Sequence, residues 1–145
     1  MKFVFDDGGR AEAGYKGLAG DCVVRAVAIA AELPYQDVYD ALSSGCRNER
    51  KSYKRSARNG VHTKEEWFKQ YMSSLGWEWV PIMGIGTGCM MHLCSSELPM
   101  GRIIVRVSKH YVAVIDGVIH DLSDCSRGGT RCVYGYWRCI RVPRY

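Results

Sequence analysis

The tightest constraint on the fold lies near the end of the chain, where Asp116-Gly117 separates two runs rich in β-branched residues, 110–115 and 118–121. An Asp-Gly pair between such runs is the strongest short-range signal of a two-residue β-hairpin turn, because both turn positions require a positive φ angle. The sequence therefore predicts two antiparallel strands whose register is set by the turn.

This register assigns the polar side chains of the hairpin to the two faces of the sheet. Val112 faces Asp121 across the strands, so His110 and Asp121 are diagonal neighbours on one face. Diagonal neighbours have Cβ atoms roughly 7 Å apart, a spacing at which a carboxylate reaches an imidazole N–H. The hairpin thus nominates His110 and Asp121 as a pair, and it places His120 on the opposite face.

A single cysteine stands at the start of an apolar helical segment. A Gly-rich run, 14–20, precedes Asp21-Cys22, and the helical pattern then continues to Leu33-Pro34. Asp21 is a favourable N-cap, so Cys22 is predicted in the first helical turn. There the unpaired backbone N–H groups and the positive end of the helix dipole favour a thiolate over a thiol.

Composition limits the class of protein without choosing a function. A chain of 145 residues, 47% of them hydrophobic, is long enough for one domain with a proper core. No apolar run approaches the ~20 residues that span a bilayer, and the N-terminus has no signal-peptide pattern. Seven cysteines without an export signal are interpreted as thiols. We therefore expect a cytoplasmic protein of a bacterium, a phage or a similar source, with no membrane partner.

Positive charge is concentrated in one segment. Residues 46–60 carry six basic residues against one acid, which equals the whole net charge of +5. The segment is interpreted as a solvated basic loop, because charge runs are usually solvated. It could also steer an acidic substrate or bind nucleic acid, although a nucleic-acid binder normally spreads basic residues over a folded face.

The remaining patterns predict helices first and strands later. Helices are expected at 22–33, at 35–44 before Gly45, and after a capping box at Thr63-Lys64-Glu65-Glu66. Strands are expected at 2–5, 77–80 and 102–108, in the hairpin, and at 131–140. The expected fold is α+β, a single domain over 1–145 in which the Cys22 helix packs on a C-terminal antiparallel sheet.

Cys22, His110 and Asp121 together form a Cys–His–Asp set, in which the thiol attacks, the imidazole moves the proton and the carboxylate orients the imidazole. A cysteine opening a helix, a histidine starting a later strand and an aspartate on the next strand resemble the papain-like cysteine peptidase fold. Asp21-Cys22 is similar to the nucleophile-helix start of NlpC-type peptidases. Residues 110–121 resemble the histidine strand and aspartate hairpin of bacteriocin-leader-processing cysteine peptidases.

The resemblance implies a thiol hydrolase that cleaves an amide or isopeptide bond of a peptide or amide-containing substrate through a Cys22 acyl-enzyme. His110 would be the base and Asp121 the orienting acid. Papain relatives carry an oxyanion-hole Gln before the nucleophile, yet residues 1–21 contain neither Gln nor Asn. The backbone N–H of Cys22, with Tyr15 or Lys16 as second donor, is the expected replacement.

Two other functions stay open, as does the oligomeric state. Transglutaminase-like or acyltransferase activity uses the same order of residues on related folds. Alternatively, the chain is an inactive papain-like binding module that recognises a host macromolecule or nucleic acid through the basic segment. NlpC-type enzymes often use His as the third member, which keeps His120 as a minority candidate.

No metal or other cofactor is expected from the cysteine and histidine spacing. Cys89, His92 and Cys94 lie close in sequence, and Cys125, Cys132 and Cys139 follow much later. Structural zinc sites usually draw on two tight C-x2–4-C pairs, and a second such pair is missing here.

Overall fold

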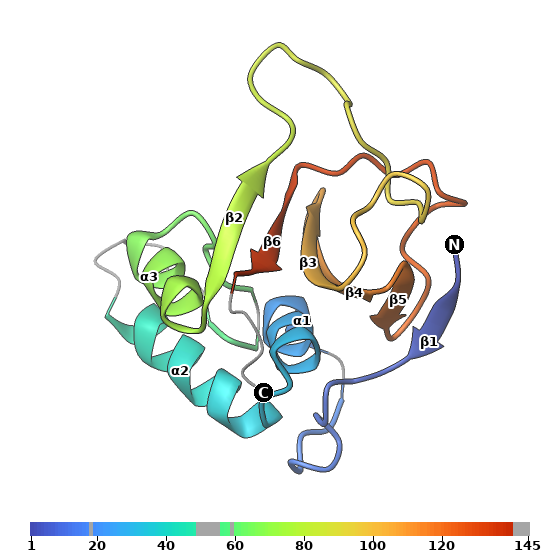
Figure 1. Cartoon of the computed structure of the whole chain (residues 1–145). Helices are drawn as coiled ribbons and strands as arrows, with labels where there is room; N and C mark the ends of the chain where they lie inside the picture. The colour runs from blue at the N-terminus through green and yellow to red at the C-terminus, as the bar shows by residue number, and fades with distance from the viewer. Residues whose placement is uncertain (18, 49–55, 59, 141–145) are drawn as a thin grey trace, which may run out of the picture.

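The structure, a computed structural model, describes residues 1–17, 19–48, 56–58 and 60–140. In chain order these residues form β1 (Phe3–Phe5), α1 (Cys22–Ala31), α2 (Tyr35–Arg47), α3 (Glu66–Ser74), β2 (Trp77–Pro81), β3 (Arg102–Val107), β4 (His110–Ile115), β5 (Val118–Asp121) and β6 (Gly135–Cys139). The described part of the chain is α+β, as the order of the sequence patterns predicts (Figure 1).

The strands form one six-stranded sheet in the order β1-β5-β4-β3-β6-β2. The four strand pairs from β5 to β2 are antiparallel, but β1 pairs with β5 in parallel. The sheet is therefore mixed, and the expectation of a purely antiparallel sheet is wrong at this edge. The parallel pairing requires a long crossover, and the chain between β1 and β5 includes all three described helices.

Two apolar cores lie on opposite faces of the sheet, because alternate strand residues point in opposite directions. Ile104, Ala113 and Trp137 face the core shared with the helices. Ile103, Val105 and Val112 belong to the second core, which the segments between β2 and β3 and between β5 and β6 cover. Figure 1 shows α1 beside the sheet with α2 and α3 farther out.

The hairpin register is confirmed. Ile115 pairs with Val118 and Ala113 pairs with His120 across β4 and β5. Asp116 and Gly117 have φ angles of 49° and 77°, the two positive values that this turn requires. The side chains of His110 and Asp121 consequently share a face, as the alternation in the sequence predicts.

The second helix is longer than its sequence pattern predicts. It runs through Gly45 to Arg47, where the sequence indicated an end at Ser44. A Cβ atom at position 45 would overlap the ring of Trp67, which lies in the first turn of α3. Helices α2 and α3 therefore approach each other closely at Gly45. Gly45 thus serves close helix packing rather than helix termination, and a local pattern does not distinguish the two roles.

The predicted capping interactions do not form. Helix α3 begins at Glu66 rather than Thr63, and its N-cap residue Glu65 makes no side-chain cap hydrogen bond. The Thr63 side chain instead lies near the Tyr111 hydroxyl, where burial raises the pKa of that group and Thr63 partly lowers it. Asp21 does occupy the N-cap position of α1, but its carboxylate makes no cap hydrogen bond because it binds other partners, described below.

Three further expectations change. The last strand begins at Gly135 rather than at residue 131, because residues 131–133 pair with 91–93. Cys89 and Cys132 form a disulfide, so the assignment of all seven cysteines as thiols is wrong for these two. The predicted basic loop loses Cys46 and Arg47 to α2, and its residues 49–55 and 59 lie outside the described residues.

None of the helices in the described ranges is both long enough and apolar enough to cross a bilayer.

Candidate functional site

Cys22 is the first residue of α1, the helix that packs against the central strands β4 and β3. The preceding glycines and the N-cap conformation of Asp21 start the helix here, and the buried Val23 and Val24 fix its first turn in the core. The backbone N–H of Tyr111, on β4, lies near the sulfur and helps to lower the pKa of the thiol. The thiol is therefore held where the helix meets the start of β4.

The hairpin brings His110 and Asp121 together. The Nε2 atom of His110 lies 2.6 Å from Oδ2 of Asp121, and the carboxylate is almost fully buried. His110 also lies close enough to the Cys22 thiol for each to shift the pKa of the other, so the three predicted residues form one connected set. His120 points elsewhere, and its Nδ1 atom lies 3.4 Å from Asp6.

The charges of this set favour a thiolate beside an imidazolium. Burial raises the pKa of the Cys22 thiol, but the hydrogen bond to His110 and the charge of that imidazole bring the pKa below its ordinary value. Burial lowers the pKa of His110, yet the hydrogen bonds to Asp121, Cys125 and Cys22 together raise it to about 11. A mutual shift of this kind is typical of activated cysteines.

Asp121 stays ionised because three donors surround it. Burial raises the pKa of this carboxyl, but the hydrogen bonds from His110 and the Leu122 backbone N–H lower it below its ordinary range. The Leu122 N–H lies 2.7 Å from Oδ1. The third donor is the Nη1 atom of Arg25, at 2.6 Å from the same oxygen.

Arg25 is the residue of this charged set that the sequence reasoning missed. It is buried on α1 and joins Asp121 to Asp21, whose Oδ1 atom lies 2.9 Å from Nε of Arg25. Asp21 in turn accepts a hydrogen bond from Tyr35 at 2.5 Å and pairs with Arg10 at 3.2 Å. The signal in the sequence is an arginine in an otherwise apolar helix face, one turn after Cys22.

These groups alternate in charge along a chain of contacts. Starting at the thiolate, the order is Cys22, His110, Asp121, Arg25, Asp21 and Arg10, with negative and positive charges in turn. Buried charges are tolerated when each is paired and hydrogen-bonded. The alternation explains why Asp21 gives up its capping role: its carboxylate is needed to neutralise Arg25.

A second thiol lies beside the imidazole. Cys125 is half-buried in the segment after β5, and its sulfur lies within 4.8 Å of ligand atoms of His110 and Asp121. The thiol helps to raise the pKa of His110. His110 and Cys125 both line a small hollow of about 400 Å³, whereas Cys22 does not border it. The sequence analysis did not predict that Cys125 lies near His110.

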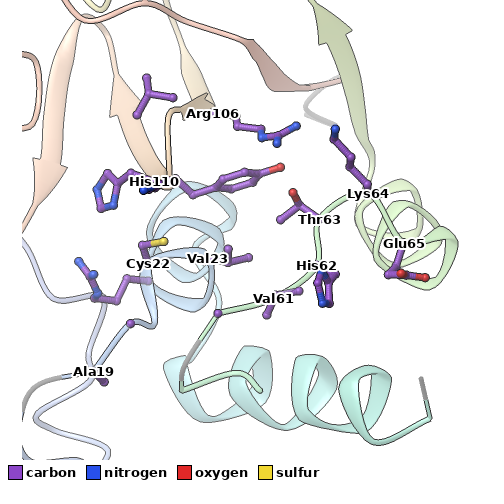
Figure 2. A pocket seen from close by; sticks show the side chains of 16 residues that line it. Ala19, Cys22, Val23, Val61, His62, Thr63, Lys64, Glu65, Arg106 and His110 are labelled. Atoms are coloured by element: carbon purple, nitrogen blue, oxygen red, sulfur yellow. The ribbon is translucent and has the colours of Figure 1, made fainter. Parts of the chain in front are cut away.

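The thiol opens into a larger cleft of about 810 Å³. One wall consists of the start of α1 and the Ala19-Gly20 segment, the facing wall is formed by residues 60–65, and the third comes from β3 and β4 (Figure 2). Among the described residues that line this cleft, Arg25, Lys64, Arg106 and Lys109 are basic and Glu65 alone is acidic. The charged ends of Lys64 and Arg106 point toward each other in Figure 2.

The two residues predicted as oxyanion donors lie away from the cleft. The Tyr15 hydroxyl donates to Gln36 on α2 at 2.9 Å, and its ring packs against Tyr35 and Tyr39. Lys16 is likewise outside the cleft lining. The cleft does contain His62, whose Nε2 atom is buried and has no hydrogen-bond partner within the described residues.

Comparison with protein-family models, with curated proteins and with solved structures finds no match to this chain.

Proposed function

We propose that this protein is a papain-like thiol hydrolase that cleaves an amide or isopeptide bond through an acyl-enzyme on Cys22. The observation that carries the proposal is the connected set of Cys22, His110 and Asp121 at the edge of a large cleft. A nucleophile, a base and a group that orients the base are what acyl transfer by a cysteine requires.

The first half of the reaction forms a thioester. The Cys22 thiolate attacks the substrate carbonyl carbon, and the carbonyl oxygen becomes an oxyanion. Because Asp121 holds Nε2 of His110, the proton that His110 transfers to the leaving amine comes from Nδ1. The C–N bond then breaks, and the acyl group remains on sulfur while the amine leaves with the proton.

The second half restores the enzyme. Neutral His110 takes a proton from water, the hydroxide attacks the thioester, and the C–S bond breaks to return the thiolate and release the acid. An amine in place of water would give the transglutaminase-like or acyltransferase reaction with the same residues. The backbone N–H groups at the start of α1 are suited to stabilise the oxyanion in both halves.

A chromogenic ester tests this chemistry without a known substrate. With p-nitrophenyl acetate we expect a burst of p-nitrophenol and an acetyl group on Cys22, found by mass spectrometry of the digested protein. Cys22→Ala and His110→Ala should abolish the burst, whereas Cys139→Ala, which removes an exposed thiol of β6, should not. Acetylation of Cys139 and Cys22 to the same extent would overturn the proposal and favour an inactive binding module.

The charge of the cleft indicates an acidic group in the substrate. The described residues offer no ion-pair partner to Lys64, Arg106 or Lys109, and the guanidinium of Arg106 lies 5.6 Å from the ring centre of Tyr134. Cations concentrated in a cleft attract anionic substrates and raise their association rate. We therefore propose that the hydrolase prefers substrates that carry a carboxylate or phosphate near the scissile bond.

Two alkylating reagents that differ in charge measure this preference directly. Iodoacetate is anionic and iodoacetamide is neutral, so the ratio of their labelling rates at Cys22 reports the local potential. We expect Lys64→Gln with Arg106→Gln to lower this ratio, and salt to lower it in the wild type. Lys69→Gln, an exposed lysine of α3 outside the cleft lining, is the matched control. An unchanged ratio in the double variant would refute the acidic preference while leaving the hydrolase proposal intact.

A further inference from the structure

A short antiparallel pairing holds His92 against Cys132, far from both in sequence. Leu93 N–H donates to the Arg131 carbonyl and Val133 N–H donates to the Met91 carbonyl, each at 2.8 Å. His92 and Cys132 therefore form a non-hydrogen-bonded pair, the kind in which side chains on one face approach most closely. Leu93 and Val133 on either side are fully buried in the second core.

Cys89 joins this pair to give a cluster of three metal-binding side chains. It forms the disulfide with Cys132, and the ligand atoms of Cys89, His92 and Cys132 all lie within 4.8 Å of one another. Two sulfurs and an imidazole nitrogen are a donor set that zinc prefers. The sequence analysis did not expect zinc because a second closely spaced cysteine pair was missing. The fold instead brings Cys132, from the segment before β6, next to Cys89 and His92.

Glu97 orients the imidazole in this cluster. Its carboxylate oxygens lie 3.2 and 3.3 Å from Nδ1 of His92, and one of them also accepts from the Cys94 thiol at 2.9 Å. A carboxylate on one ring nitrogen fixes the tautomer and directs the other nitrogen, Nε2, toward a metal. This partner is an observation independent of the two cysteines, since a disulfide needs no oriented histidine.

We propose that Cys89, His92 and Cys132 form a zinc site when the disulfide is reduced, so that disulfide and metal are alternative states of one site. Reduction consumes two electrons and two protons from a dithiol, which itself becomes a disulfide. Zn²⁺ then displaces the two thiol protons and binds two thiolates and Nε2 of His92, with a solvent molecule as fourth ligand. The site is separate from the Cys22 cleft and does not depend on the proposed function.

The movement that the metal state needs is small and lies on the exposed side. Tetrahedral zinc with Zn–S bonds of about 2.3 Å requires the two sulfurs to stand about 3.8 Å apart. Cys89 is exposed, so rotation of its side chain opens the cluster, while the backbone hydrogen bonds hold His92 and Cys132 in place. The expected consequence is that either state ties the segment between β2 and β3 to the segment before β6.

The other cluster of potential ligands is less suited to a cation. His110, Asp121 and Cys125 also lie within 4.8 Å of one another. There, however, the Arg25 guanidinium already forms an ion pair with Asp121, and a bound dication would be repelled by this buried positive charge. The test below therefore uses a Cys125→Ser background, in which only the first cluster retains its thiols.

Cobalt provides a spectroscopic probe of the site. We reduce the full chain with a phosphine, remove the phosphine without oxygen, and titrate with Co²⁺ and then Zn²⁺. We expect one equivalent of Co²⁺ to give a thiolate charge-transfer band and strong visible bands of tetrahedral cobalt, both removed by Zn²⁺. The oxidised protein should give neither band, because its sulfurs are joined.

Variants then identify the ligands. Cys89→Ser, Cys132→Ser or His92→Ala should weaken Co²⁺ binding at least tenfold, and Glu97→Gln should weaken it about 10–100-fold by freeing the imidazole. Cys94→Ser is the matched control, because this thiol contacts Glu97 but lies outside the cluster, and it should keep both bands. Absence of tetrahedral bands in the reduced protein, or their loss in Cys94→Ser alone, would overturn the proposal.

Discussion

Asp121→Asn isolates the contribution of the buried carboxylate to the charge of His110. The substitution keeps the size and the hydrogen-bonding oxygen of the side chain but removes the negative charge that lies 2.6 Å from Nε2. Arg25 still reaches an oxygen acceptor at position 121 and retains its ion pair with Asp21. The main change is therefore the loss of a charge-assisted hydrogen bond to the imidazolium.

The size of the effect follows from that hydrogen bond. Hydrogen bonds to charged groups contribute about 1.5–3 kcal/mol, and one pKa unit corresponds to about 1.36 kcal/mol. The pKa of His110, raised to about 11 in the wild type, should therefore fall by about one to two units. Because the thiolate needs its imidazolium partner, the alkaline limit of ester hydrolysis should move down by the same amount.

NMR titration of the imidazole Cε1–H signals measures this pKa directly. His110→Gln assigns the signal among the four histidines. Asp124→Asn is the control, because this carboxylate binds Ser126, two residues away. Among the described residues it makes no hydrogen bond or ion pair with His110. A His110 midpoint in Asp121→Asn equal to that of the wild type would refute the account of the site given above.

Other perturbations test the packing and the charges around the site. The pKa of Asp121 is lowered in the folded state, so the unfolded chain binds its proton first as pH falls. As pH falls below about 5, the wild type should therefore lose more thermal stability than Asp121→Asn. Arg25→Met leaves Asp21 and Asp121 without their shared ion-pair partner. We expect the free energy of unfolding, measured in urea, to fall by about 3–5 kcal/mol, and a decrease below about 1 kcal/mol would contradict the buried network. Gly45→Ala should lower the stability by about 1–3 kcal/mol through overlap with Trp67, and a gain from helix propensity would show that the helices separate easily.

What could be predicted at the site came from local rules. The turn chemistry of Asp116-Gly117 and the two-residue alternation of strands were enough to pair His110 with Asp121 and to reject His120, because these residues lie within twelve positions of one another. Cys22 at a helix start was equally local. These are the relations in which backbone geometry alone determines which side chains meet.

Local rules failed where a residue had a distant competitor. Asp21 has the chemistry of an N-cap, but Tyr35, 14 positions away, binds its carboxylate instead. Arg25 binds it too, and Asp121 holds that arginine from 96 positions away. Gly45 has the chemistry of a helix stop, yet the approach of Trp67 gives it a packing role. In both cases a tertiary contact outweighed an intrinsic preference that is worth only about 1 kcal/mol.

The sequence by itself determined the α+β order, the hairpin register and the pairing of His110 with Asp121, since each depends on neighbours along the chain. It nominated Cys22 as their partner, but the packing of α1 on β4 brings the three residues together. Only the tertiary structure decided that Arg25 links Asp21 to Asp121, 96 positions away, and that Cys132 meets Cys89 and His92. Contacts between distant segments depend on how the sheet and helices pack as a whole. No periodicity or spacing in the chain encodes that packing, because many pairings satisfy the same local pattern.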